Sequence, residues 1–140
     1  MGGVLAIDYG DKKCGFASTD ALRVSLQPLP VLRHEGREEL LFAHLAALLD
    51  ERDVGLLLVG VPLDPDGGAG PRALLVRAFA TRLRARFPGL EVREWDERLT
   101  TKEAEGRLRE QGVRGRSARA ERDSWSARVL LEDWLRSQGP

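Results

Sequence analysis

The chain has 140 residues with 22 basic and 22 acidic side chains, so no global positive field marks it as a nucleic-acid-binding protein. The hydrophobic fraction of 42% excludes wholesale disorder, and the length fits one domain spanning residues 1–140. A single cysteine excludes a disulfide framework and a cysteine-based zinc site. No apolar stretch is long enough to span a membrane and no signal-peptide pattern opens the chain, so we expect a cytoplasmic protein without a membrane partner.

The first predicted strand, residues 4–7, runs directly into Asp8. Four apolar residues in a row are typical of a strand buried on both faces, in the middle of a parallel or mixed sheet. A carboxylate at the exit of such a strand is poorly solvated and needs a cation, a donor or a metal beside it. Asp8 is therefore a candidate metal ligand, and its partners are expected elsewhere in the chain.

A three-stranded meander is predicted for the N-terminal part of the chain. Small residues at 14–19 predict a second strand, joined to the first by a short polar link as in a hairpin. Alternation over residues 24–29 predicts a third, half-exposed strand. Pro28 and Pro30 lack amide donors, so this strand should be an edge strand or should end there.

Two helix–strand units are predicted next. Helical spacing indicates a helix over residues 37–52, and the apolar run over 54–62 indicates a strand beside the first and parallel to it. A second helix is expected from Pro71 to about residue 87, and a last strand over 90–95. The inward stripes are predicted to be Leu40, Leu41, His44, Leu45, Leu48 and Leu49 on the first helix, and Leu74, Leu75, Ala78, Phe79 and Leu83 on the second.

Two further helices complete the predicted fold. A capping box formed by Thr100 and Glu103 starts a helix that reaches about residue 111, and a final helix covers about residues 120–136. The order of elements predicts an α/β fold: a five-stranded mixed sheet, made of a meander and two βα units, with helices on both faces.

Carboxylates are expected to gather at one edge of this sheet. Parallel strands end on the same edge, so Asp8 and the pair Asp96 and Glu97 should meet there. On the last helix, Asp123 precedes the inward-facing Ala127 by one turn; a metal ligand and a helix N-terminal charge are the two explanations for it. Crowded carboxylates need divalent cations, and oxygen ligands select Mg²⁺ or Mn²⁺. Two such ions can clamp a phosphodiester.

The histidines and tryptophans offer no competing catalytic arrangement. His44 lies on the stripe of the first helix, where a position in or at the rim of the core is favoured over metal binding. His34 lies in a polar link and is expected to be exposed. Trp95, Trp125 and Trp134 are expected to pack in the protein rather than stack on bases.

Four motifs, in order along the chain, resemble the YqgF (RuvX) family of Holliday junction resolvase-like proteins and pre-16S ribosomal RNA nucleases. They are IDYGDKKCGFA at 7–17, VGVPLDPDG at 59–67, DERLTT at 96–101 and DSWSA at 123–127. Each motif alone is weak, but together they cover nearly the whole chain. The resemblance implies an RNase H-like fold.

The resemblance also implies a function and its residues. Asp8, the pair Asp96 and Glu97, and Asp123 would correspond to the family's acidic triad, which uses Mg²⁺ or Mn²⁺. The enzyme would be a nuclease, a hydrolase of phosphodiesters, acting on branched DNA or on the 5′ end of precursor 16S ribosomal RNA.

Three positions depart from the family's usual pattern. Lys13 stands where an arginine is usual and keeps a basic partner for phosphate. Cys14 replaces an aliphatic residue, and Asp64 replaces a common asparagine. Whether Asp64 strengthens metal binding or weakens the approach of nucleic acid stays open.

Basic residues supply candidate contacts to the nucleic-acid backbone. Lys12 and Lys13 follow the first strand, and Arg98, which follows the acidic pair, could contact a phosphate or a neighbouring acid. The segment 112–122 is expected to be a loop or a helix start whose arginines contact phosphates or are simply solvated. These arginines are Arg114, Arg116, Arg119 and Arg122. Glycines 67, 68 and 70 could cradle a phosphate or form a turn.

Two other functions stay open at the level of the sequence. The stretch of Asp8, Gly10, Lys12 and Gly15 also resembles the first phosphate loop of actin-like ATPases and sugar kinases, although those enzymes use two such domains. A catalytically weak, nucleic-acid-binding ribosome-assembly factor is the second alternative. The sequence decides neither between DNA and RNA nor between a monomer and a homodimer.

Overall fold

The computed structural model describes the backbone of residues 2–96 and 115–138, and the side chains of residues 2–96 and 126–138. The strands are β1 (Gly3–Asp8), β2 (Lys13–Thr19), β3 (Leu26–Arg33), β4 (Val54–Val61) and β5 (Glu91–Asp96). The helices are α1 (Glu38–Glu51), α2 (Pro71–Arg86) and α4 (Gly115–Ser137).

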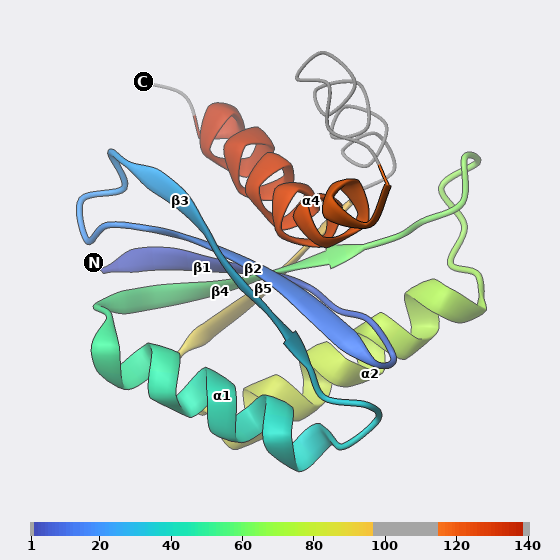
Figure 1. Ribbon diagram of the computed structural model, residues 1–140, viewed down its shortest axis with the longest axis horizontal. Coiled ribbons are helices and arrows are strands. Elements are labelled where there is room, and N and C mark those ends of the chain that lie inside the picture. The colour runs from blue at the N-terminus through green and yellow to red at the C-terminus, as the bar shows by residue number, and fades with distance from the viewer. Residues whose placement is uncertain (1, 97–114, 139–140) are drawn as a thin grey trace.

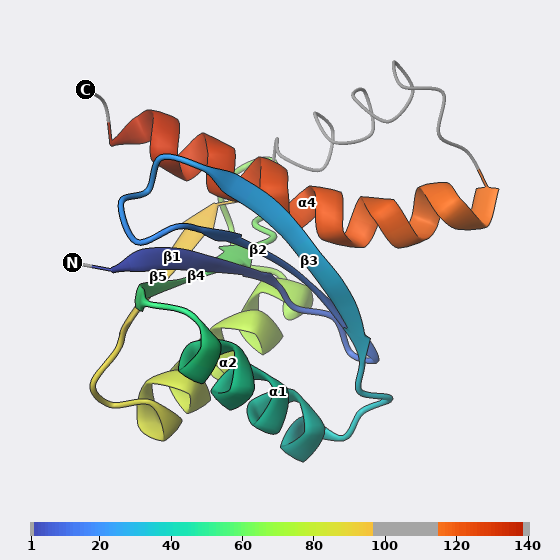
Figure 2. The same cartoon turned by 60° about the vertical axis from the view of Figure 1, so that its left-hand side comes forward.

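The five strands form one mixed sheet in the order β3-β2-β1-β4-β5. The meander β1–β2–β3 is antiparallel, whereas β1, β4 and β5 are parallel, as the sequence predicts. Helices α1 and α2 cover one face of the sheet and α4 crosses the other (Figure 1). The C-terminal end of α4 lies on the side where β1 begins, and its N-terminal half on the side where β1 ends (Figure 2).

Each face of the sheet has its own hydrophobic core because side chains alternate along the strands. On β1, Leu5 and Ile7 pack with α1 and α2, whereas Val4 and Ala6 pack with α4. All four side chains are fully buried, which confirms the prediction that the first strand is central. Within a regular strand, odd-numbered residues therefore face one side of the sheet and even-numbered residues the other. We call this odd or even position the parity of a residue.

β3 is an edge strand that continues through its two prolines. It runs to Arg33, so the possibility that it ends at Pro28 or Pro30 is wrong, and it begins at Leu26 rather than Val24. The two prolines are two residues apart, so both ring nitrogens face the same side. That side can be the unpaired edge, where no amide donor is needed.

α2 is rotated relative to the predicted orientation. Its buried residues are Ala73, Val76, Phe79, Ala80 and Leu83, whereas Leu74, Leu75 and Ala78 are exposed, and so is Leu40 on α1. Arg77 and Arg84, seven residues apart, both pair with Glu94 of β5, at 3.1 and 3.2 Å. The side of the helix that carries these arginines therefore lies next to β5, and small alanines at 73 and 80 lie on the buried face.

α4 begins earlier than predicted. It starts at Gly115 rather than at about residue 120, so positions 116, 119 and 122 are helical. Of the two alternatives for the segment 112–122, a loop or a helix start, the helix start is confirmed from residue 115. Arginine, alanine and glutamate, which dominate residues 116–122, all favour helix. The helix predicted over residues 100–111 lies outside the described residues. Within the described part of the chain, no helix combines the length and apolar character needed to cross a membrane.

Phe79 provides a test of the α1 and α2 core. Its side chain is fully buried, with its ring 4.1 Å from that of Tyr9. We expect Phe79→Ala to lower the free energy of unfolding by about 3–5 kcal/mol, measured by urea denaturation. Leu74→Ala, on the exposed side of the same helix, should change it by no more than about 0.5 kcal/mol. Equal losses for the two variants would contradict the observed rotation of α2.

Candidate metal site and its adjoining loop

Asp8 ends β1 on the face that α4 covers, because it shares the parity of Val4 and Ala6. Its side chain is half-buried. Its partner on β2 is Gly15, and continuing the β1–β4 register by one residue places Gly60 on its other side. Neither neighbouring strand projects a side chain next to this carboxylate. A carboxylate oxygen at the end of a strand can act as a ligand of a hydrated cation.

That Gly15 and Gly60 flank Asp8 was not predicted from the sequence. Gly15 lies among small residues and Gly60 lies within the apolar run of β4. A glycine inside a strand is a weak signal for close approach by a ligand or another backbone. Only the pairing register shows that both of them border Asp8.

Asp96 does not share the face of Asp8. Along β5, Trp95 packs with the α4 core and its indole N–H donates to Asp133 of α4 at 2.8 Å, whereas Glu94 pairs with α2. Position 96 has the parity of Glu94 and therefore belongs to the α2 face. It is also two strands away from β1, a backbone separation of about 10 Å. The structure thus brings Asp8 and Asp96 to one edge of the sheet, but on opposite faces.

The remaining predicted ligands fall outside the described side chains. Glu97 lies beyond β5, and Asp123 is in α4, where only the backbone is described at that position. Position 123 is eight residues beyond Gly115, so the helix N-terminal explanation loses its basis, since that effect is confined to the first turn. Among the side chains that are described, no three His, Cys, Asp or Glu residues form a group that could hold a metal ion.

The loop after Asp8 is held by α2. The guanidinium of Arg72 donates to the Tyr9 carbonyl at 2.5 Å and to the Asp11 carboxylate at 2.7 Å. Gly10 is required in this loop, since a Cβ there would lie 2.2 Å from the Lys13 carbonyl oxygen. Arg72 was not among the predicted functional residues, and no signal in the sequence links it to residues 9–11.

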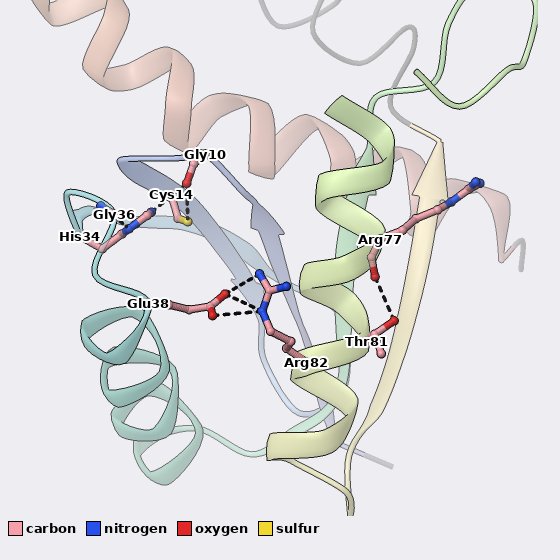
Figure 3. A network of polar contacts seen from close by, with 8 residues as sticks. All are labelled: Gly10, Cys14, His34, Gly36, Glu38, Arg77, Thr81 and Arg82. Atoms are coloured by element: carbon pink, nitrogen blue, oxygen red, sulfur yellow. Dashed lines mark hydrogen bonds and ion pairs between the residues drawn. The ribbon is translucent and has the colours of Figure 1, made fainter. Parts of the chain in front are cut away.

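His34 holds the same loop from the other side, and the expectation that it is exposed is wrong. Its side chain is 2% exposed, and its Nε2 lies 2.8 Å from the Gly10 carbonyl oxygen (Figure 3). The Gly36 amide donates to its Nδ1 at 3.1 Å. The backbone N–H groups of His34 and Glu35 both donate to the Lys12 carbonyl. His44, by contrast, is half-buried against Phe16, as predicted for the rim of the core.

Tyr9 anchors the end of β1 on the face opposite to Asp8. Its ring stacks on Phe79, with the centroids 4.1 Å apart and the planes inclined by 17°. Burial, and then the negative charge of Glu38, raise the pKa of its hydroxyl. Glu38 accepts three hydrogen bonds from Arg82, at 2.7–3.0 Å, and so joins α1 to α2 (Figure 3). This pairing raises the pKa of Arg82.

The predicted basic contacts are only partly described. Lys12 is exposed and Lys13 half-buried in the β1–β2 connection, two of the positions expected for phosphate contacts. Arg98 and Arg114 lie outside the described residues. Arg116, Arg119 and Arg122 lie on α4, with undescribed side chains.

The glycine-rich segment after β4 forms a turn of its own. The Gly68 amide donates to the Asp66 carboxylate, Asp64 and Gly68 pair through the backbone, and Gly67 has a positive φ of 88°. Asp64 and Asp66 are exposed. These internal hydrogen bonds agree with the turn that the sequence analysis offered as one of two explanations.

Two tryptophans pack within the protein, as predicted. Trp134 is 1% exposed, and Trp95 packs against the same core. The side chain of Trp125 is not among those described.

Comparisons with solved structures place the fold in a known class. RuvC of Thermus thermophilus in complex with a Holliday junction substrate aligns with a TM-score of 0.58 and 17% identity, covering 99% of this chain and 97% of RuvC. A second Thermus thermophilus RuvC structure aligns with a TM-score of 0.55. The fold is therefore RuvC-like, an α/β fold of the RNase H class.

Sequence comparisons identify the family. The RuvX family model, described as Holliday junction resolvase, matches residues 2–137. A protein of Anaeromyxobacter sp. (strain Fw109-5), named "Putative pre-16S rRNA nuclease", is 46% identical over 131 residues, covering 94% of each chain. A protein of the same name from Dechloromonas aromatica (strain RCB) is 38% identical over 137 residues, covering 98% of this chain and 92% of its own length. The chain belongs to the RuvX family.

The environment of Tyr9 can be measured directly, since it is the only tyrosine in the chain. We expect one tyrosinate absorbance transition with its midpoint above the ordinary pKa of 10.0. Because the folded pKa is raised, its contribution to stability is complete below pH 10 and is lost as the pH rises through the folded value. Glu38→Gln should move the midpoint down by removing a negative charge. A wild-type midpoint at or below 10 would contradict the described burial.

Proposed function

We propose that this protein is a metal-dependent nuclease that hydrolyses phosphodiesters in structured nucleic acid. Membership of the RuvX family and the RuvC-like fold support this function. The structural observation that carries it is the half-buried Asp8 on the α4 face, with glycines on both neighbouring strands. A half-buried carboxylate at the end of a central strand, bordered by the main chain of two glycines, suits the binding of a cation.

The proposed metal ligands are Asp8, Asp123 and one residue of the pair Asp96 and Glu97. Asp8 lies on the face covered by α4, the helix that carries position 123. Since Asp96 has the parity of the opposite face, we assign the ligand from the pair to Glu97. Oxygen ligands of this kind suit Mg²⁺ or Mn²⁺. When bound, two such ions would neutralise phosphate charge and lower the pKa of an attacking water.

The proposed phosphate contacts come from both ends of the chain. Lys12 and Lys13 lie four and five residues after Asp8. Helical positions 116, 119 and 122 belong to the N-terminal half of α4, on the side where β1 ends (Figure 2). The set is completed by Arg98 and Arg114, as the sequence analysis suggests. Contacts of this kind position the backbone of a nucleic acid and weaken with rising salt.

The substrate is proposed by analogy with relatives. The relatives named as pre-16S rRNA nucleases point to precursor 16S ribosomal RNA, and the family description points to a Holliday junction. The 5′ end of the precursor is what the resemblance of the motifs implies. We propose precursor ribosomal RNA as the first substrate to test and the branched DNA as the second. A cytoplasmic location and a monomeric or homodimeric state remain predictions. Binding of either substrate without any cleavage would favour the assembly-factor alternative.

Removing a proposed ligand should abolish cleavage. We expect Asp8→Asn and Asp123→Asn each to lower the rate more than about a hundredfold, since even outer-shell partners of a metal contribute 10–100-fold. Chelation by EDTA should have the same effect, and Mn²⁺ should restore activity. Asp50→Asn, at an exposed position on α1, is the control and should cleave like the wild type. Unchanged cleavage by the Asp8 variant would rule out the assignment.

The assignment within the acidic pair has its own test. We expect Glu97→Gln to lose cleavage as severely as Asp8→Asn. Asp96→Asn should retain most of the rate, because its strand position belongs to the α2 face. The two variants should be compared at saturating Mn²⁺ with thermal melting as a control for folding. If Asp96→Asn loses cleavage and Glu97→Gln keeps it, the assignment of the ligand from strand parity is wrong.

A further inference from the structure

We propose that His34 is a positioning residue for this nuclease site: its ring fixes the loop between Asp8 and Lys13. The inference rests on the function proposed above for Asp8. His34 was expected to be exposed. It is instead one of the few buried polar residues in the described part of the chain.

A tight turn sets the orientation of the imidazole. Glu35 and Gly36 both have positive φ, at 53° and 82°, and the Arg37 amide donates to the His34 carbonyl at 2.9 Å. This turn brings the Gly36 N–H to Nδ1 of His34. Because Nδ1 faces the Gly36 N–H and acts as an acceptor, we assign the N–H of the ring to Nε2.

The protonated Nε2 then determines the position of the loop. It donates to the Gly10 carbonyl at 2.8 Å, two residues beyond Asp8. The Cys14 thiol approaches the same oxygen at 3.9 Å, a weak second contact (Figure 3). The Gly10–Asp11 peptide is trans, so directing the carbonyl at His34 directs the Asp11 N–H to the opposite side.

The rest of the loop is fixed from two elements. Arg72 of α2 holds the Tyr9 carbonyl, and the backbone of residues 34 and 35 holds the Lys12 carbonyl. The ring of His34 also lies parallel to that of Tyr9, with 6.3 Å between the centroids and 15° between the planes. The His34 ring supplies the only described side-chain nitrogen that donates to the Gly10 carbonyl. Without it, the spacing between Asp8 and the lysines at 12 and 13 would be set less firmly.

Two amide substitutions separate the two roles of the ring. His34→Gln places an N–H donor near the position of Nε2 and can keep the bond to Gly10, but it loses the acceptor for Gly36. His34→Asn places an oxygen near the position of Nδ1 and can keep the bond from Gly36, but it loses Gly10. A residue needed only for the turn would be replaced better by asparagine. A residue needed for the loop would be replaced better by glutamine.

We expect glutamine to rescue and asparagine to fail. His34→Asn should lower kcat about tenfold with a smaller change in KM. A small displacement of Asp8 or of the loop lysines lowers the rate of the chemical step more than it weakens substrate binding. It should also weaken Mn²⁺ binding about tenfold, measured by electron paramagnetic resonance without nucleic acid. In the metal-free protein, amide hydrogen exchange of residues 10–12 should be faster in His34→Asn than in His34→Gln. Glu39→Gln, at an exposed position on α1, is the control and should match the wild type.

Two results would overturn the proposal. One is a His34→Asn variant that matches His34→Gln in amide exchange and in Mn²⁺ affinity. The other comes from the wild-type protein and does not depend on any variant folding: imidazole nitrogen resonances showing the proton on Nδ1 would exclude the bond to Gly10. If the wild type cleaves nothing, the proposed nuclease function fails, while amide exchange and the tautomer still decide the role of His34.

Discussion

The structure depends on the two-sided burial of β1 and on what happens at its end. Because the strand is central, its alternating side chains supply both hydrophobic cores. The same alternation places Asp8 and Tyr9, at the end of the strand, on opposite faces of the sheet. Asp8 faces α4 and has a glycine beside it on each neighbouring strand, whereas Tyr9 is on the opposite face and packs on Phe79. The stacking of the half-buried Tyr9 on Phe79 therefore helps to hold the backbone next to the candidate ligand.

The loop that follows β1 is held in place by hydrogen bonds to its carbonyl groups. Three carbonyl oxygens of the loop accept hydrogen bonds: that of Tyr9 from Arg72, that of Gly10 from His34, and that of Lys12 from the backbone after β3. These partners come from α2 and from the end of an edge strand, two regions distant in sequence. Functional groups on a loop held in this way can keep the precision that metal and phosphate chemistry requires. The basic side chains of the loop remain at the surface, where a large anionic substrate can reach them.

Much of the fold could be predicted from local patterns. Apolar runs indicated β1 and β4 as buried strands, helical spacing located α1 and α2, and the order of elements predicted the mixed sheet and its parallel strands. The rotation of α2 could not be predicted, because its leucines and alanines offer two apolar faces and only packing against the sheet selects one of them. Helix propensities favour an early start of α4, but the glycines and charges around residues 112–122 left a loop and a helix start as equal alternatives.

The sequence alone determined that a carboxylate ends a buried strand, that further acids follow the last strand and lie on the last helix, and that the chain resembles one family of nucleases. Tertiary structure decided what lies around these acids. Strand parity separates Asp96 from Asp8, pairing brings Gly15 and Gly60 to the sides of Asp8, and a turn buries His34 against Gly10. The physical reason is that local patterns reflect the solvation of each residue, whereas cross-strand register and side-chain hydrogen bonds join residues that are distant in sequence.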